Sequence, residues 1–439
     1  MTYTGAEAQT TTISEEIMNE NTVGAQVEQR YWVGIDWGKS THTVSVVDDR
    51  RSSVEQFSIR ATLPGFAQLA EKLKRWEPIG GIAIESTRNL VVAYLLGEGY
   101  RIYPINPKLS KNWREGNSVA AVKSDERDPD VLALELARRH ESLRPLEQAE
   151  PAVAELMALC ENLRSLINQR SAHVKRLKDA LGQYYPAALE FFTDWSSPVA
   201  WRFLKRFPTA SSLSAARKTT LVGFLKANRI GLSPLWLERI ERRSQATAWP
   251  STPEAPALEA MALATVAQLL ALQPHIDKLD HRIEEHTKAL PHADLIRSLP
   301  GAGKRLAPAL TAITGGIAAT NGGYQALRCL TGVAPVPEQS GSRCRVRVRR
   351  RCNKRWRDTL HLFAFCSTRF CQWAKAFYDL CRERGNSHAT ALRKLADKWL
   401  KIICRMIDTG QPYDDKRYVE CLRTNNSPVY FRLCGKSCA

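Results

Sequence analysis

Short apolar runs alternate with helix-like segments from Tyr31 to about Leu143, and no other feature limits the possible folds as strongly. Strands are expected at Tyr31–Asp36, Val44–Val47, Val54–Ile59, Ile82–Glu85 and Ile102–Ile105, and helices at Gly65–Trp76 and Leu90–Gly97. Strands and helices in alternation form layered α/β units. The pattern therefore predicts an α/β domain with a mixed sheet, in which Trp37–Thr41 turns the first strand into the second as a hairpin.

Four acids of this region are candidate metal ligands. Asp36 ends the first apolar run, Glu85 ends a later one, and Asp125 and Asp128 lie three residues apart. Asp36 and Glu85 can face each other if their strands are neighbours, and one helical turn would place Asp125 and Asp128 on a single face. Carboxylate oxygens suit Mg²⁺ or Mn²⁺, and two such ions can clamp the reacting oxygens of a phosphodiester.

Three of these acids also have a simpler interpretation. Asp36 can be a turn acid that accepts hydrogen bonds from its own hairpin, and Glu85 a strand-end carboxylate in water. Asp128 stands directly before Pro129, where an aspartate commonly caps a helix. Taken singly, these interpretations are favoured; taken together, the four acids favour a metal site.

The charge of the chain indicates its partner class. With 439 residues it has material for two or three domains, and its formal net charge is +18. Lys and Arg side chains attract polyanions and release condensed counterions from phosphates, so nucleic acid is the expected partner. No run of ~18 apolar residues and no signal peptide is evident, so a cytoplasmic protein without membrane contact is expected.

Two later segments have a heptad-like apolar spacing. The first has apolar residues in steps of four and three, interrupted at Arg170: Leu156, Cys160, Leu163, Ile167, Val174, Leu177 and Leu181. The second has the same steps from Leu269 through Leu272, Ile276 and Leu279 to Ile283, and Leu290 follows one heptad later. This spacing is typical of coiled coils, although Pro274 is expected to kink or restart the second helix. The two helices could pack together or pair between subunits. The basic segment Ser196–Ala248 between them has no legible function.

The C-terminal part contains two motifs with possible chemistry. Leu299–Lys304 resembles the turn of a helix-hairpin-helix, in which the amides of Gly301 and Gly303 and the charge of Lys304 would contact a DNA backbone. A plain interhelical turn is the alternative. Further on, prolines and glycines fix a loop, Gly332–Ser342, around the hydroxyls of Ser340 and Ser342, either of which is a candidate nucleophile.

An arginine run follows this loop. The basic residues alternate with apolar ones, as a strand with one charged face would, and comprise Arg343, Arg345, Arg347 and Arg349, extended by Lys354 and Arg355. Guanidinium groups bind phosphate well, so this segment is expected to contact nucleic acid rather than only water.

The order of these motifs resembles that of insertion-sequence transposases of the IS110 family, over nearly all of Tyr31 to about Asp408. The resemblance implies an RNase H-like (RuvC-like) N-terminal domain with a DEDD acidic set, a helical coiled-coil middle, and a mostly helical transposase domain with a helix-hairpin-helix-like motif. Carried over to this sequence, the acids are Asp36, Glu85, Asp125 and Asp128, and the nucleophile is Ser340, directly before Gly341. It also implies a structured noncoding guide RNA that pairs with donor and target DNA.

The expected domains are a disordered tail at 1–29, the DEDD domain at 30–146, the coiled-coil linker at 147–292, the transposase domain at 293–410 and a poorly ordered tail at 411–439. The expected activity is recombination through a phosphoserine intermediate, by a dimer or tetramer in a prokaryotic cytoplasm, associated with the nucleoid. Two alternatives stay open: a metal-dependent junction nuclease without serine chemistry, and a nonenzymatic nucleic-acid-binding protein.

Overall fold

The computed structural model describes residues 29–86, 89–117, 127–146, 150–248, 252–318, 323–341 and 343–435. The expected N-terminal tail and Asp125 lie outside this part of the chain, apart from Gln29. The side chains of Ser340, Arg343 and Arg345 are also not described. The chain divides into two compact units, residues 1–148 and 149–439.

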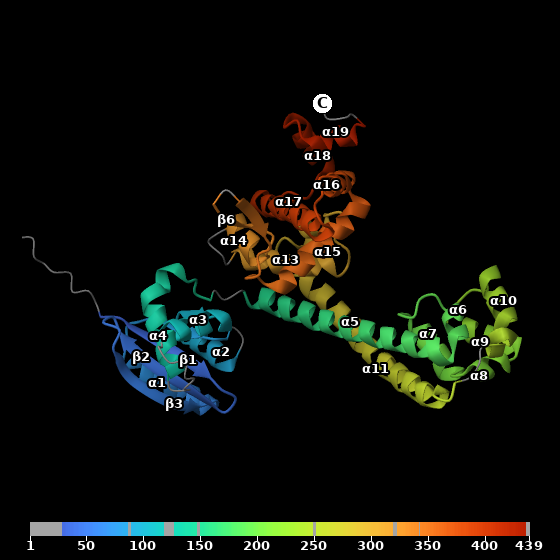
Figure 1. The fold of residues 1–439 in the computed structure, drawn as a ribbon, viewed down its shortest axis with the longest axis horizontal. Helices are drawn as coiled ribbons and strands as arrows, with labels where there is room; N and C mark the ends of the chain where they lie inside the picture. The colour runs from blue at the N-terminus through green and yellow to red at the C-terminus, as the bar shows by residue number, and fades with distance from the viewer. Residues whose placement is uncertain are drawn as a thin grey trace, which may run out of the picture. The chain divides into compact units, whose positions relative to one another are not determined.

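A five-stranded sheet organises the first unit (Figure 1). Its order is β3-β2-β1-β4-β5, formed by β1 (Tyr31–Trp37), β2 (Thr41–Asp48), β3 (Ser53–Arg60), β4 (Ile79–Ile84) and β5 (Ile102–Pro104). Strands β1 to β3 form an antiparallel meander, whereas β4 and β5 run parallel to β1. The predicted α/β unit with a mixed sheet is confirmed, and each predicted strand lies within a few residues of the observed one.

Helices cover both faces of this sheet. On one face, α1 (Leu63–Lys74) and α2 (Leu90–Gly97) pack on the side chains that alternate inward from β1 and β2, such as Val33 and Val44. On the other, α3 (Pro107–Asn117) and α4 (Arg127–Arg139) pack on Trp32, Val47 and Ala83. A short 3₁₀ turn, His140–Ser142, follows α4.

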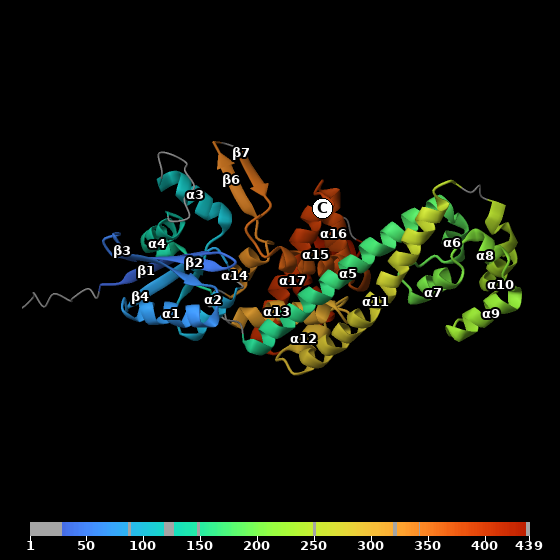
Figure 2. The same ribbon diagram turned by 90° about the horizontal axis from the view of Figure 1, so that it is seen from below.

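A long antiparallel helix pair begins the second unit: α5 (Pro151–Tyr184) and α11 (Ala255–Lys288) lie side by side in both views (Figures 1 and 2). Arg282 Nη2 lies 2.5 Å from Glu155 Oε1 near one end, and Arg170 Nη1 donates to Gln273 Oε1 at 3.0 Å farther along. The two apolar seams thus pack against each other within one chain.

Of the two expected effects of Pro274, a kink or a restart, the restart does not occur, because α11 continues through Pro274 as one helix. Pro274 is exposed, so water can satisfy the carbonyl that loses its amide partner, while buried Ile276 and Ile283 hold the helix against α5. Among the described residues, α11 is the one helix whose length and composition would allow it to cross a membrane. The search of the sequence for uninterrupted apolar runs did not identify this helix.

A small helical bundle connects α5 to α11. It consists of α6 (Pro186–Phe191), α7 (Pro198–Arg206), α8 (Ala210–Ser214), α9 (Lys218–Ala227), α10 (Pro234–Glu241) and a 3₁₀ segment, η2 (Arg242–Ala248). Its core is aromatic: the rings of Phe191 and Phe203 are stacked with centroids 4.6 Å apart, and Trp201 is fully buried.

The rest of the second unit is mostly helical, as predicted. The elements are α12 (Ala293–Arg297), α13 (Leu306–Ala318), α14 (Gly323–Leu330), β6 (Val336–Ser340), β7 (Arg343–Arg347), α15 (Lys354–Phe370), α16 (Gln372–Glu383), α17 (His388–Thr409), α18 (Asp415–Thr424) and α19 (Pro428–Leu433). Buried Trp373, Trp399 and Phe363 form the centre of its core.

Two expectations about this region are wrong. The segment after Pro412 is not a poorly ordered tail: it forms α18 and α19, because Leu422 and Val429 are buried in the same core. The proline-rich stretch before Gly341 is not a loop, since Val336–Ser340 pairs with Arg343–Arg347 as an antiparallel hairpin. A two-stranded hairpin consists only of edge strands, which tolerate a proline such as Pro337.

Candidate active site

Two of the predicted acids lie at the carboxyl ends of adjacent parallel strands. In the pairing of β1 with β4, Ile35 lies opposite Ile84, so Asp36 and Glu85 are the next residues on each strand. Ile35 and Ile84 are buried beneath α1 and α2, so the alternation of strands directs Asp36 and Glu85 to the opposite face. The condition set by the sequence, that the two strands be neighbours, is met.

Helix α4 begins on that same face because Gly34 has no side chain. A Cβ at Gly34 would lie 1.9 Å from the carbonyl oxygen of Pro129 and 2.7 Å from the nitrogen of Ala133. Ser45 lies opposite Gly34 on the neighbouring strand β2, and its hydroxyl donates a hydrogen bond to Asp130 of α4. This bond ties the start of α4 to β2 as well as to β1. The first turn of α4 is thereby held against the middle of the sheet.

Asp128 lies in that first turn. The helix begins at Arg127, so Asp128 is not the residue that caps it from outside, as the sequence interpretation suggested. Its side chain is only 9% exposed, and Oδ2 accepts a hydrogen bond from Arg114 Nη1 at 2.5 Å. The same guanidinium nitrogen lies 3.8 Å from Glu85 Oε1. One cationic group therefore holds Glu85 and Asp128 together.

Sequence reasoning did not find Arg114. It lies on α3, in a segment whose sequence carries no recognised motif, and only the packing of α3 beside α4 brings it to the acids. No signal in the sequence points to this pair, because the burial of Asp128, which calls for a partner of opposite charge, is itself a result of the packing.

The donor set fits a divalent cation. Glu85 and Asp128 present oxygens to one shared positive group, and Asp36 is the next-to-last residue of the neighbouring strand β1, on the same face. Hard oxygen ligands of this kind are preferred by Mg²⁺ and Mn²⁺. Within the described residues, which exclude Asp125, no group of three or more potential ligands is close enough to hold an ion as the structure stands.

The hairpin that carries Asp36 is closed by a buried histidine. His42 is 4% exposed, its ring stacks on Phe66, and its Nδ1 accepts a hydrogen bond from the Gly38 amide at 3.2 Å. Burial lowers the pKa of this imidazole. The neutral ring therefore supports the turn beside Asp36.

The helix-hairpin-helix-like motif forms a tight turn between α12 and α13. Gly301 has a φ of +84°, and a Cβ there would lie 3.1 Å from the backbone of Cys366 and Ser367, whereas a Cβ at Gly303 would meet open space. Lys304 Nζ lies 3.2 Å from Glu284 on α11. The left-handed turn is therefore needed for packing, and the lysine already has an acidic partner.

Ser340 ends β6, and its backbone pairs with that of Arg343 across the turn at Gly341. Ser342 lies outside the described residues. Of the arginine run, Arg347 forms an ion pair with Glu338 on the same hairpin, and Arg349 buries its Nε without a hydrogen-bond partner in the described part of the chain.

Two further basic candidates start α15. Arg355 forms an ion pair with Glu161 of α5, while Lys354 is the first residue of the helix and exposed. Of these predicted phosphate contacts, Lys304, Arg347 and Arg355 each have a carboxylate neighbour, which nucleic acid would have to displace.

Comparison with known proteins agrees with this architecture. Residues 33–186 match a transposase model of the DEDD type, and residues 293–379 match the model of the transposase IS116/IS110/IS902 family. The chain is 28% identical over 400 residues to a mini-circle transposase named for IS117 in Streptomyces coelicolor, covering 88% of this chain and 95% of the relative. It is 28% identical over 391 residues to a 44.8 kDa insertion-element protein of IS116 from Streptomyces clavuligerus, covering 86% and 94%.

A third relative, a 42 kDa insertion-element protein of IS900 from Mycobacterium paratuberculosis, is 26% identical over 400 residues, which cover 86% of this chain and 96% of the relative. The class defined by the two domains is that of a transposase, an enzyme that recombines DNA. Within this class, the chain belongs to the IS110 family of insertion sequences.

Proposed function

We propose that this transposase cuts and rejoins donor and target DNA through a covalent link to Ser340, with Asp36, Glu85, Asp125 and Asp128 as its acidic set. The observation that carries the proposal is the position of Asp36 and Glu85 at adjacent strand ends, with Asp128 bound to the same arginine as Glu85. A protein that only bound nucleic acid would have no need to gather these acids.

We also propose that the first unit has an RNase H-like (RuvC-like) fold. The strand order β3-β2-β1-β4-β5, an antiparallel meander followed by two parallel strands, supports this assignment. So do the helices on both faces and acids at the ends of the central strands. The proposed domains remain 30–146 and 147–292, preceded by the tail at 1–29, while the transposase domain begins at 293 and extends beyond 410 to include α18 and α19, whose Leu422 and Val429 pack in its core.

Asp36, Glu85 and Asp128, with Asp125, are the residues that would hold Mg²⁺ or Mn²⁺. A bound divalent ion would neutralise charge on a phosphodiester and favour loss of a proton from an attacking hydroxyl. Ser340 Oγ would form a bond to phosphorus as the bond from phosphorus to one sugar oxygen breaks, and that oxygen would leave as a hydroxyl. A second hydroxyl attacking the phosphoserine then restores Ser340 and rejoins the DNA without net hydrolysis.

The specificity of the reaction is proposed to come from a structured noncoding RNA that pairs with both DNA partners. The formal charge of +18 supports binding of more than one nucleic acid. Because the two apolar seams pack within the chain, they do not by themselves argue for a dimer. Two DNA partners, each with two strands to cut, are the remaining reason to propose a dimer or tetramer, acting in the prokaryotic cytoplasm.

The proposal is tested by a denaturing-gel assay for protein bound covalently to DNA, with Mg²⁺, donor and target duplexes and RNA transcribed from the flanks of the gene. The intact chain should give a metal-dependent adduct, and Ser340→Ala and Asp36→Ala should give none. Ser342→Ala is the matched control and should retain the adduct.

The alternatives predict different results. Cleavage without an adduct that persists in Ser340→Ala would identify the junction nuclease. An adduct lost only in Ser342→Ala would reassign the nucleophile. Binding without any cleavage, with every RNA from the flanking DNA, would favour the nonenzymatic protein.

A further inference from the structure

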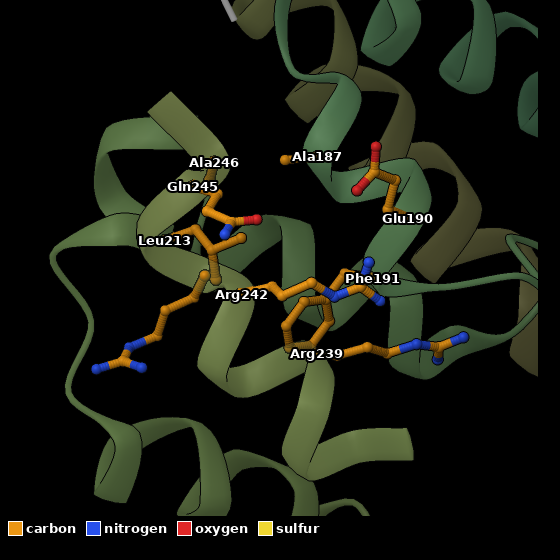
Figure 3. A pocket seen from close by; sticks show the side chains of 9 residues that line it. Ala187, Glu190, Phe191, Leu213, Arg239, Arg242, Gln245 and Ala246 are labelled. Atoms are coloured by element: carbon orange, nitrogen blue, oxygen red, sulfur yellow. The ribbon is translucent and has the colours of Figure 1, made fainter. Parts of the chain in front are cut away.

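The helical bundle between α5 and α11 contains a pocket that the catalytic proposal does not use. The pocket has a volume of about 380 Å³ and lies between α6, α8, α10 and η2 (Figure 3). Arg239, Arg242 and Arg243 line it, together with Glu190 and an apolar floor that includes Phe191 and Leu213. Pockets of this size accommodate a small ligand or one unit of a polymer.

The arginines are held by contacts that leave donors available. Arg243 donates Nε to the carbonyl of Ala216 and Nη1 to the carbonyl of Ile240, both at 2.9 Å. Arg239 lies over the Trp236 ring, with Cζ 4.9 Å from the centroid, and in the described part of the chain it makes no ion pair. Two guanidinium groups are thus oriented before any ligand arrives, which lowers the entropic cost of binding.

The acids around the pocket do not balance these charges. Glu190 is the one carboxylate among the described lining residues. Arg242 lies 3.3 Å from Glu238, an exposed pair that binds weakly and can be exchanged for a ligand. Glu241 is bound to Lys218 and lies 4.0 Å from Arg243. An anion would therefore be attracted to the pocket.

The surroundings favour a polymer over a small anion. Residues 184–248 contain ten Lys and Arg against four Asp and Glu. Several of the basic side chains are exposed on other helices of the bundle, including Lys205, Arg206 and Lys226. A free phosphate would occupy the pocket alone, whereas a nucleic-acid strand would also use this surrounding charge.

We propose that this arginine pocket binds a backbone phosphate of single-stranded nucleic acid, so that the bundle is a nucleic-acid contact separate from the acidic site and from the β6–β7 hairpin. Guanidinium groups provide paired donors for the phosphate oxygens, and the apolar floor accepts the sugar or base. The inference does not depend on Ser340 chemistry.

The test measures fluorescence anisotropy of a labelled single-stranded RNA, a single-stranded DNA of the same sequence and a duplex, titrated with the full chain at several salt concentrations. The pocket variant is Arg239→Gln with Arg242→Gln; Arg243 is kept because its backbone contacts stabilise the bundle. The control, Lys74→Gln with Arg75→Gln, removes the same charge from exposed positions at the end of α1 in the first unit, which the proposed contact does not include.

Single-strand affinity should fall about tenfold or more in the pocket variant and less than about threefold in the control, and the salt slope should fall by about 1 to 2 in the pocket variant. A second pair, Arg239→Lys with Arg242→Lys, should weaken binding less, because it keeps charge and loses only the paired donors. Equal losses in pocket variant and control, or no loss in a folded pocket variant, would overturn the proposal. Preference for RNA or for DNA identifies which strand supplies the phosphate.

Discussion

Replacing Gly34 with alanine tests how the acidic site is built. The new Cβ would lie 1.9 Å from Pro129 O and 2.7 Å from Ala133 N, and both contacts are with helix backbone that no side-chain rotation relieves. Normal contact requires α4 to move away by more than about 1 Å, which opens the buried layer of Leu132 and Leu136. Overpacking commonly costs about 1 to 3 kcal/mol, so a loss of about 3 kcal/mol of unfolding free energy is expected.

The assay combines thermal unfolding of the full chain with hydrogen exchange of the β1 and α4 peptides. For a unit of this size, about 3 kcal/mol corresponds to a lowering of Tm by roughly 10 °C, with faster exchange in both peptides. Gly116→Ala is the control: a Cβ there meets open space within α3, and alanine in a helix stabilises by up to about 1 kcal/mol.

The functional consequence follows from the position of Asp128. Displacing a catalytic group by about 1 Å can reduce the rate about 100-fold. With Asp128 in the proposed acidic set, Gly34→Ala should therefore lose the proposed adduct even below its Tm. If Gly34→Ala had the stability and exchange of the intact chain, α4 would not depend on the missing side chain, and the geometric reasoning would be refuted.

Three further outcomes are expected. Arg114→Ala leaves the buried Asp128 without its partner, so the free energy of urea unfolding should fall by about 2 kcal/mol, and adding Asp128→Asn should recover part of this loss. Calorimetry should find tighter Mg²⁺ binding in Arg114→Ala, because the guanidinium no longer competes for the acids. Unchanged stability with weaker Mg²⁺ binding would contradict this. Burial lowers the pKa of His42 in the folded chain, so the neutral imidazole contributes to stability above about pH 6.5, and this contribution is lost as the pH falls below that value. The Tm of the intact chain should therefore drop on acidification, and the Tm of His42→Gln should drop less. Gly301→Ala should lose about 1 to 2 kcal/mol because of its left-handed backbone, whereas Gly303→Ala should be neutral; comparable DNA-binding losses in both would show that the turn also contacts DNA.

The sequence by itself determined the local elements and their order. Strands such as Tyr31–Trp37 follow from short apolar runs, and helices such as Leu63–Lys74 follow from apolar residues at helical spacing. Both signals are properties of residues close together in the sequence. It also determined that Asp36 and Glu85 close apolar runs, and that the segments of α5 and α11 have the same heptad-like spacing. The family followed from the order of these motifs.

Only the tertiary structure decided which distant groups meet. The contact of Arg114 with Asp128, the approach of α4 to Gly34 and the burial of Leu422 and Val429 all join segments whose separation in sequence carries no periodic signal. Packing also overrode local rules, since α11 continues through Pro274 against α5. Local patterns constrain backbone conformation, but the partners of buried charges and apolar faces are chosen by the whole chain as it excludes water.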